Sequence, residues 1–208
     1  MMLGIGNLLR GMAIGFSIAA PVGPIGVLCI RRTLDHGRAV GFASGLGAAA
    51  ADAAYGCIAG FGLTLISNVL IGQQVWLRLV GGLFLCYLGV RAFVARPAEP
   101  AASPGRRGLL GAYGSTLLLT LTNPMTILSF AAVYAGLGIG SARGGYGAAA
   151  MLVLGTFAGS ALWWLTLSSF VSVLRTRLGS RVLQWVNRSS GVVLVGFGLA
   201  ALLSLTRT

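Results

Sequence analysis

One acidic residue, Asp52, lies inside a long apolar segment and is the side chain best suited to chemistry. It stands 14 positions beyond Arg38, which corresponds to roughly 20 Å along a helix that rises ~1.5 Å per residue. A carboxylate at such a depth in a membrane costs about 2.5–3.5 kcal/mol. The chain has no lysine, and its one histidine, His36, falls in a predicted loop. Asp52 is therefore predicted to line a pathway, where it binds a substrate ammonium group or a coupling proton. A protonated acid that holds a helix contact is the alternative.

Small and polar residues share the helical face of Asp52. They recur at spacings of three and four residues, which is typical of one side of a helix. They are Gly45, Ala48, Ala49, Asp52, Tyr55 and Gly56. A similar face without the acid follows about 108 positions later, as Gly155, Thr156, Gly159, Ser160, Trp163 and Trp164. Tyr55, Ser160 and Trp163 are predicted to line the same pathway. For Trp163 and Trp164, a role as anchors at the membrane interface stays open.

Proline residues interrupt two apolar segments. Pro21, Gly23 and Pro24 form the first break, and Asn123 and Pro124 form the second. Proline has no backbone N–H, so Pro124 is expected to leave the carbonyl of Thr120 without its helical partner. In lipid, such a group is tolerated only where protein or a wet cavity meets it. Gly23 is expected to let another group approach closely. Each break also creates a helix N-terminus that favours a substrate carboxylate, although a simple packing kink is the alternative. The prolines also favour a retained helix over a cleaved signal peptide.

These landmarks belong to two copies of one pattern. Pro24 and Pro124 are 100 positions apart, and Asp52 and Ser160 are 108 apart. Pairs 109 apart follow, namely Trp76/Trp185, Gly82/Gly191 and Gly89/Gly198. Each copy contains three predicted membrane-crossing segments, and because three is odd, the second copy must be inverted. The predicted organisation is a first three-helix repeat at 1–96, a cytoplasmic linker at 97–108 and a second repeat at 109–208. Inverted repeats with broken helices are typical of secondary transporters whose site lies at the repeat interface.

Composition and charge predict an all-α integral membrane protein. Apolar residues make up 56% of the chain and charged residues 9%, whereas about a quarter of the residues in soluble domains are charged. A bilayer-crossing helix needs about 20 residues, and six segments reach this length: 11–30, 39–66, 74–95, 109–135, 146–174 and 184–205. Of the 15 arginines, eleven flank the first, third and fifth loops. The first loop is predicted to contain Arg31, Arg32, Asp35, His36, Gly37 and Arg38. Basic residues mark the cytoplasmic side, so both termini are predicted outside. The net charge of +12 forms no clustered basic face, which argues against nucleic-acid binding.

Other activities lack the residues that they need. A metal or inorganic cation exporter needs several intramembrane carboxylates, histidines or methionines close together. A membrane enzyme needs a nucleophile with a base, a carboxylate pair or a set of metal ligands, and Asp52 has no second acid nearby in its segment. Cys29, Cys57 and Cys86 lack metal-ligand spacing. No catalytic residue, metal or cofactor is expected. A cation exporter and a membrane subunit without transport activity remain the alternatives.

At these residues the chain resembles the LysE/RhtB family of amino-acid exporters. The resemblance rests on the motif at 20–24 (APVGP), on Gly41 through Asp52 and on Asn123-Pro124. It covers essentially the whole chain, although Val22 and Ile25 depart from the motif of many members. It implies a six-helix exporter of amino acids or related small metabolites in the bacterial inner membrane, driven by the proton gradient or by exchange. The family's motif residues carry over to Pro21, Gly23, Pro24, Asp52, Asn123 and Pro124. The expected partners are an amino acid and the lipid bilayer, and the choice between a monomer and a homo-oligomer stays open.

Overall fold

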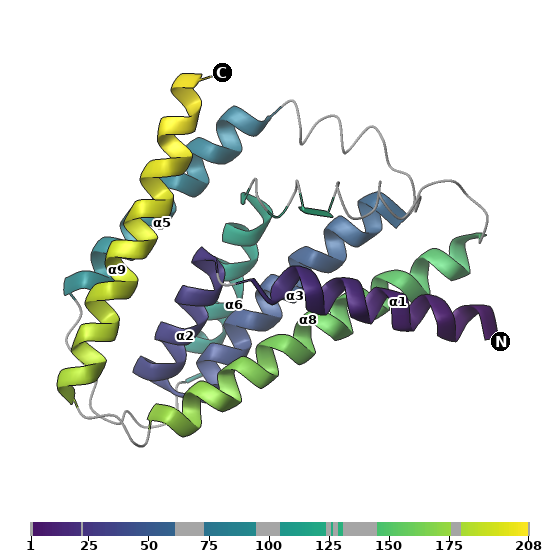
Figure 1. Ribbon diagram of the computed structural model, residues 1–208, viewed down its shortest axis with the longest axis horizontal. Coiled ribbons are helices and arrows are strands. Elements are labelled where there is room, and N and C mark those ends of the chain that lie inside the picture. The colour runs from purple at the N-terminus through teal and green to yellow at the C-terminus, as the bar shows by residue number, and fades with distance from the viewer. Residues whose placement is uncertain are drawn as a thin grey trace.

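Helices make up the regular secondary structure of the computed structural model, which describes residues 2–21, 23–60, 73–94, 105–123, 126, 129–130, 145–175 and 180–207. Figure 1 shows their arrangement. The α-helices are α1 (Met2–Ala19), α2 (Pro24–His36), α3 (Arg38–Gly60), α5 (Gln74–Val94), α6 (Arg106–Leu121), α8 (Gly145–Arg175) and α9 (Ser180–Leu203). A short 3-10 helix, η1 (Ser204–Arg207), follows α9.

Two of these helices are long and apolar enough to cross a membrane. They are α8, over Tyr146–Arg175, and α9, over Gln184–Leu203. The pair α1 and α2 passes the same test as one span, which is bent by 81° between Ile5–Ala19 and Pro24–His36. The described part of the chain is thus helical, as predicted, with helices long and apolar enough to cross a membrane. The count of six spans stays a prediction, and parts of the predicted second and fourth spans lie outside the described residues.

The break between α1 and α2 follows from the local sequence. The N–H of Ala20 still donates to the carbonyl of Phe16 at 3.0 Å, but Pro21 comes next and has no N–H to continue the helix. Pro24 occupies the first turn of α2, a position that suits proline because the N–H there would have no helical partner. The segment predicted as one span at 11–30 is therefore two helices. Its second part, α2, extends to His36.

The loop predicted around residues 31–37 is wrong, because α2 continues through most of it. Only Gly37 separates α2 from α3, and its φ of 91° is in the left-handed region that favours glycine. Arg31, Arg32 and Asp35 therefore lie on a helix, and Asp35 is buried. Their place between two apolar segments had made them look like loop residues.

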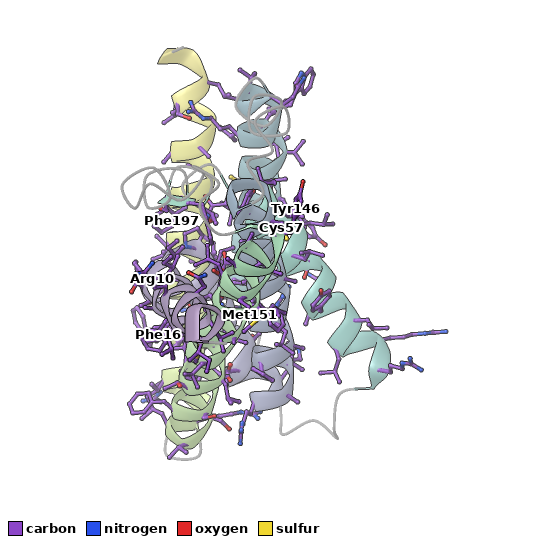
Figure 2. The ribbon with its side chains drawn as sticks, turned by 90° about the vertical axis from the view of Figure 1, so that its right-hand side faces the viewer. Arg10, Phe16, Cys57, Tyr146, Met151 and Phe197 are labelled. Atoms are coloured by element: carbon purple, nitrogen blue, oxygen red, sulfur yellow. The ribbon has the colours of Figure 1, made fainter. Side chains whose placement is uncertain are left out.

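Glycines allow α1 and α8 to pack in close contact. A Cβ atom at Gly11 or Gly15 of α1 would overlap backbone atoms of α8, and one at Gly155 or Gly159 would overlap backbone atoms of α1. Small residues at four-residue spacing are a known means of close helix contact in membranes. Figure 2 labels Phe16 on α1 and Met151 on α8 in this region.

The other helices are linked to this pair through contacts with α8. α3 packs against both α6 and α8, α2 packs against α3, α8 and α9, and α5 pairs with α9 (Figure 1). A buried apolar cluster connects the α1–α2 break with α3 and α8, and it includes Ala19, Leu28, Ala48, Ala49 and Trp164. This packing turns the Asp52 face of α3 toward α8.

Candidate functional site

Asp52 forms a hydrogen bond across the contact between α3 and α8. Its side chain is only 3% exposed. The hydroxyl of Ser160 on α8 donates to Oδ2 of Asp52 at 2.7 Å, and Nε1 of Trp164 donates to Oγ of Ser160 at 3.1 Å. The carboxyl group thus lies inside the protein and not among lipid chains. Two of the predicted pathway residues, Asp52 and Ser160, are brought into direct contact.

The two adjacent tryptophans, Trp163 and Trp164, have different contacts in the structure, which the sequence could not distinguish. Trp164, which was not among the predicted site residues, joins the hydrogen bonds of Asp52 and is buried. Gly45 on α3 makes room for it, because a Cβ atom there would overlap the Trp164 side chain. Trp163 instead packs edge-on against Phe16 of α1, with ring centroids 5.3 Å apart and planes at 80°. The indole of Trp163 therefore contributes to the contact between α1 and α8.

Tyr55 connects the helix of Asp52 to the second proline break. It lies one turn beyond Asp52 on α3, and its hydroxyl donates to the backbone carbonyl of Leu121 at 2.6 Å. Leu121 is the last residue of α6. The Tyr55 ring also lies 5.7 Å from that of Phe130. The phenol thus satisfies a carbonyl where the helix ends.

The end of α6 differs in one detail from the sequence expectation. The carbonyl of Thr120 was expected to lack a partner, but it accepts from the N–H of Asn123 at 3.1 Å. The shorter turn satisfies Thr120, and the next carbonyl along, that of Leu121, is the one that Tyr55 meets. Asn123 lies two residues beyond Leu121, the last residue of α6, after the C-cap residue Thr122. Pro124 lies outside the described residues.

The first break lies beside the same packed region. Pro21 is exposed and Gly23 and Pro24 are partly exposed, while Ala19 and Ile25 on either side are buried in the cluster that holds Trp164. No described atom lies within 4 Å of the position that a Cβ of Gly23 would occupy, so the close approach expected at Gly23 stays a prediction. No described contact joins this break directly to Asp52.

Sequence reasoning missed a partly buried arginine, Arg32, that links three helices. Nη1 of Arg32 on α2 donates to Ser44 Oγ on α3 at 2.9 Å, and to the Ala112 carbonyl at 2.9 Å and Thr116 Oγ1 at 2.8 Å, both on α6. Nη2 donates to Ser115 Oγ at 2.8 Å. A guanidinium group offers five donors in a fixed plane, which suits such a junction. The signal was present in the sequence, because Arg32 follows an apolar run without any loop residue between.

Comparison with known proteins gives matches along most of the chain. The family described as LysE type translocator matches residues 16–205. The putative amino acid efflux protein YcgF of Bacillus subtilis is 27% identical over 195 residues, which cover 91% of this chain and 92% of that protein. The threonine efflux protein of Salmonella typhi is 28% identical over 155 residues, with 66% and 70% covered. That of Escherichia coli K12 is 27% identical over 162 residues, with 69% and 74% covered. No solved structure gives a significant match.

Proposed function

Because this chain belongs to the LysE type translocator family, we propose that it exports an amino acid across a bacterial inner membrane along the contact between α3 and α8. The substrate class is supported by relatives named for amino acid and threonine efflux. The observation that carries the assignment of the pathway is the buried hydrogen bond between Asp52 and Ser160. An ionisable group buried between membrane helices marks substrate and proton pathways.

The chemistry of an amino acid fits this arrangement. Its ammonium group, or a coupling proton in its place, would bind the Asp52 carboxyl group when Ser160 releases it. Its carboxylate would meet the positive N-terminal end of α2, where the helix restarts at Pro24. The Tyr55 bond to Leu121 holds the second break on the same face of α3. Both ionic groups of the substrate would then have a partner near the breaks.

The inverted-repeat organisation is supported by the contact between Asp52 and Ser160. These residues occupy matching positions of the two copies, 108 apart, and they bind each other. A two-fold axis relating the copies brings matched residues together only where it passes between them. We therefore place the pseudo-two-fold axis of the transporter close to this hydrogen bond.

The pair of α5 and α9 supports the same axis. Gly82 matches Gly191 in the repeat and Gly89 matches Gly198, and the contacts are crossed. The Cβ position of Gly82 lies 3.0 Å from the carbonyl oxygen of Gly198, and that of Gly89 lies 2.8 Å from the carbonyl oxygen of Gly191. Crossed contacts are the signature of two-fold symmetry. The residue numbers run in opposite directions along α5 and α9, so the two helices are antiparallel. The proposed two-fold axis is therefore perpendicular to both helices, and it lies in the membrane plane when they cross the membrane.

Two further matched glycines make equivalent contacts. A Cβ atom on Gly47 of α3 would lie against a carbonyl of α6 and the N–H four residues later, and one on Gly155 of α8 would do the same on α1. The contacted residues are Tyr113 and Leu117 for Gly47, and Leu8 and Met12 for Gly155. These contacts support two repeats, at 1–96 and 109–208. The proposed orientation, with a cytoplasmic linker at 97–108 and both termini outside, rests instead on the eleven arginines that flank the first, third and fifth loops. Transport would then proceed by rocking of one repeat against the other.

Export from cells loaded with dipeptides tests the proposal. Cells that produce the protein should release the amino acid faster than cells that lack it, and Asp52→Asn should lower the rate at least about tenfold. Glu99→Gln, which removes an acid from the 97–108 segment, is the matched control and should export at the normal rate. Full export by Asp52→Asn for every amino acid tried would refute the role of Asp52.

Purified protein in liposomes separates the two roles of the carboxyl group. If Asp52 carries the coupling proton, Asp52→Asn should keep the exchange of labelled for unlabelled amino acid but lose accumulation driven by a pH gradient. If Asp52 binds the substrate ammonium group, both activities should fall together.

A further inference from the structure

A second polar cluster lies at the end of α2 opposite the proline break. Nδ2 of Asn187 on α9 donates to Oδ1 of Asp35 on α2 at 2.9 Å. Nη2 of Arg175 on α8 donates to the backbone carbonyl of Asp35 at 3.2 Å. Nε of Arg31, one turn earlier on α2, lies 3.3 Å from Oδ2 of Asp35. We name these four residues the α2 latch, and Figure 1 shows the ends of α2 and α8 near the start of α9 at the lower left.

The latch joins the two proposed repeats. Arg31 and Asp35 belong to the first repeat, whereas Arg175 and Asn187 belong to the second. Pro24 and Asp35 are 11 positions apart, which is roughly 16 Å along α2. The latch therefore holds the free end of a short helix whose other end is the 81° break.

Two polar atoms of the α2 latch lack a hydrogen bond. Asn187 is only 1% exposed, yet within the described part of the chain its Oδ1 accepts no hydrogen bond and Nε of Arg31 donates none. Buried polar groups that lack a partner are costly. A cluster that is fully satisfied by its own members would resist opening. Oδ1 of Asn187 gains a hydrogen bond when water reaches it, and Nε of Arg31, which is held only by its ion pair with Asp35, gains one as well.

We infer that the α2 latch is the cytoplasmic gate of this translocator, closed in the present structure, and that its opening swings α2 away from α8 and α9. The inference rests on the proposed function and on the excess of arginines in the segments around the latch, which marks the cytoplasmic side of a membrane protein. It assigns Asp35 and Asn187 as gating residues that do not bind substrate in the pathway of Asp52.

Cys29 reports directly on the opening of this gate. It lies six residues before Asp35 on α2, roughly 9 Å away along the helix, and is buried. With Cys57 and Cys86 replaced by alanine, Cys29 is the single thiol of the chain. A membrane-impermeant methanethiosulfonate reagent should label it slowly in the protein with an intact latch. In Asn187→Ala the rate should rise about tenfold or more in inside-out vesicles, because a hydrogen bond to a charged group is lost.

Two further variants make the test specific. Ser189→Ala, on the same helix, removes an exposed hydroxyl that donates only to the carbonyl of its own helix at Trp185, and it should leave the labelling rate unchanged. The exchange Asp35→Asn with Asn187→Asp restores one amide and one carboxyl group across the contact, so it should return the rate toward the original value. Equal thermal unfolding midpoints of Asn187→Ala and Ser189→Ala would show that the single variant is folded.

The outcomes separate the gate from the transport activity, because labelling needs no transport. Equal labelling of Asn187→Ala and Ser189→Ala would overturn the gate. Faster labelling only in right-side-out vesicles would overturn its cytoplasmic assignment. Faster labelling in inside-out vesicles without any amino acid export would keep the gate and overturn the substrate class.

Discussion

Replacing Ser160 with alanine removes the hydroxyl that links the carboxyl group of Asp52 to the indole of Trp164. The variant keeps the size and burial of the site almost unchanged, because only one oxygen atom is lost. Two polar groups then lose a partner inside the protein, since Ser160 donates to Asp52 at 2.7 Å and accepts from Trp164 at 3.1 Å. The change therefore isolates the hydrogen bonds from the packing between α3 and α8.

The expected cost follows from the number and kind of bonds lost. Hydrogen bonds between membrane helices contribute about 0.6 kcal/mol on average and about 1.7 kcal/mol at most. A bond to a charged group contributes about 1.5–3 kcal/mol. Loss of both bonds of Ser160 should therefore lower the free energy of unfolding by about 1–3 kcal/mol. The upper end applies if the carboxyl group of Asp52 is ionised. In the Asp52→Asn background the acceptor is neutral, so the cost of Ser160→Ala should fall below that in the original protein.

An unfolding titration in mixed detergent micelles measures these differences. Ser168→Ala is the matched control, because Ser168 is also buried on α8 but donates only to carbonyls of its own helix, those of Trp164 and Leu165. Alanine favours helices slightly more than serine, so this control should change the free energy of unfolding by less than about 0.5 kcal/mol. The reasoning is refuted if Ser160→Ala costs no more than Ser168→Ala.

Two further predictions concern the other contacts of the site. Tyr55→Phe keeps the ring but leaves the carbonyl of Leu121 without its donor, so it should destabilise the protein by about 1 kcal/mol and slow export. Tyr87→Phe, which alters an exposed phenol, should do neither, and equal unfolding midpoints for the two variants would contradict the role of Tyr55. Gly15→Ala forces α1 away from a carbonyl of α8 and should cost about 1–3 kcal/mol. Gly6→Ala meets no described atom within 4 Å and should leave the unfolding midpoint equal or higher, and the same loss in both would argue against the close contact.

The sequence predicted the parts of the fold that depend on local chemistry. Pro21 ends α1 because it lacks an N–H, and this holds whatever surrounds it. Gly11 and Gly15 allow close packing because they lack a Cβ, although only the structure shows that they face α8. The apolar composition likewise indicated membrane helices, because composition can be read without knowing which helices pack together. Asp52 and Ser160 were recognised from the sequence as matching positions, but the hydrogen bond between them is a finding of the structure.

The C-terminal end of α2 could not be predicted from local sequence. The charged residues Arg32 and Asp35 resemble the end of a span when only composition is considered. The helix restarts at Pro24, however, so its remaining residues reach as far as Gly37. These charged residues therefore lie on a helix that packs against other helices, and Arg32 donates hydrogen bonds to Ser44 on α3 and Thr116 on α6.

The sequence alone predicted an all-α integral membrane protein with proline breaks, a buried acid and glycine-lined helix faces. The tertiary structure decided which tryptophan adjoins the acid, which carbonyl Tyr55 binds, and that Asp35 meets Asn187. The physical reason is the range of the interactions. A missing N–H or Cβ acts on its own residue, whereas a hydrogen bond between side chains 108 or 152 positions apart exists only after the helices have packed.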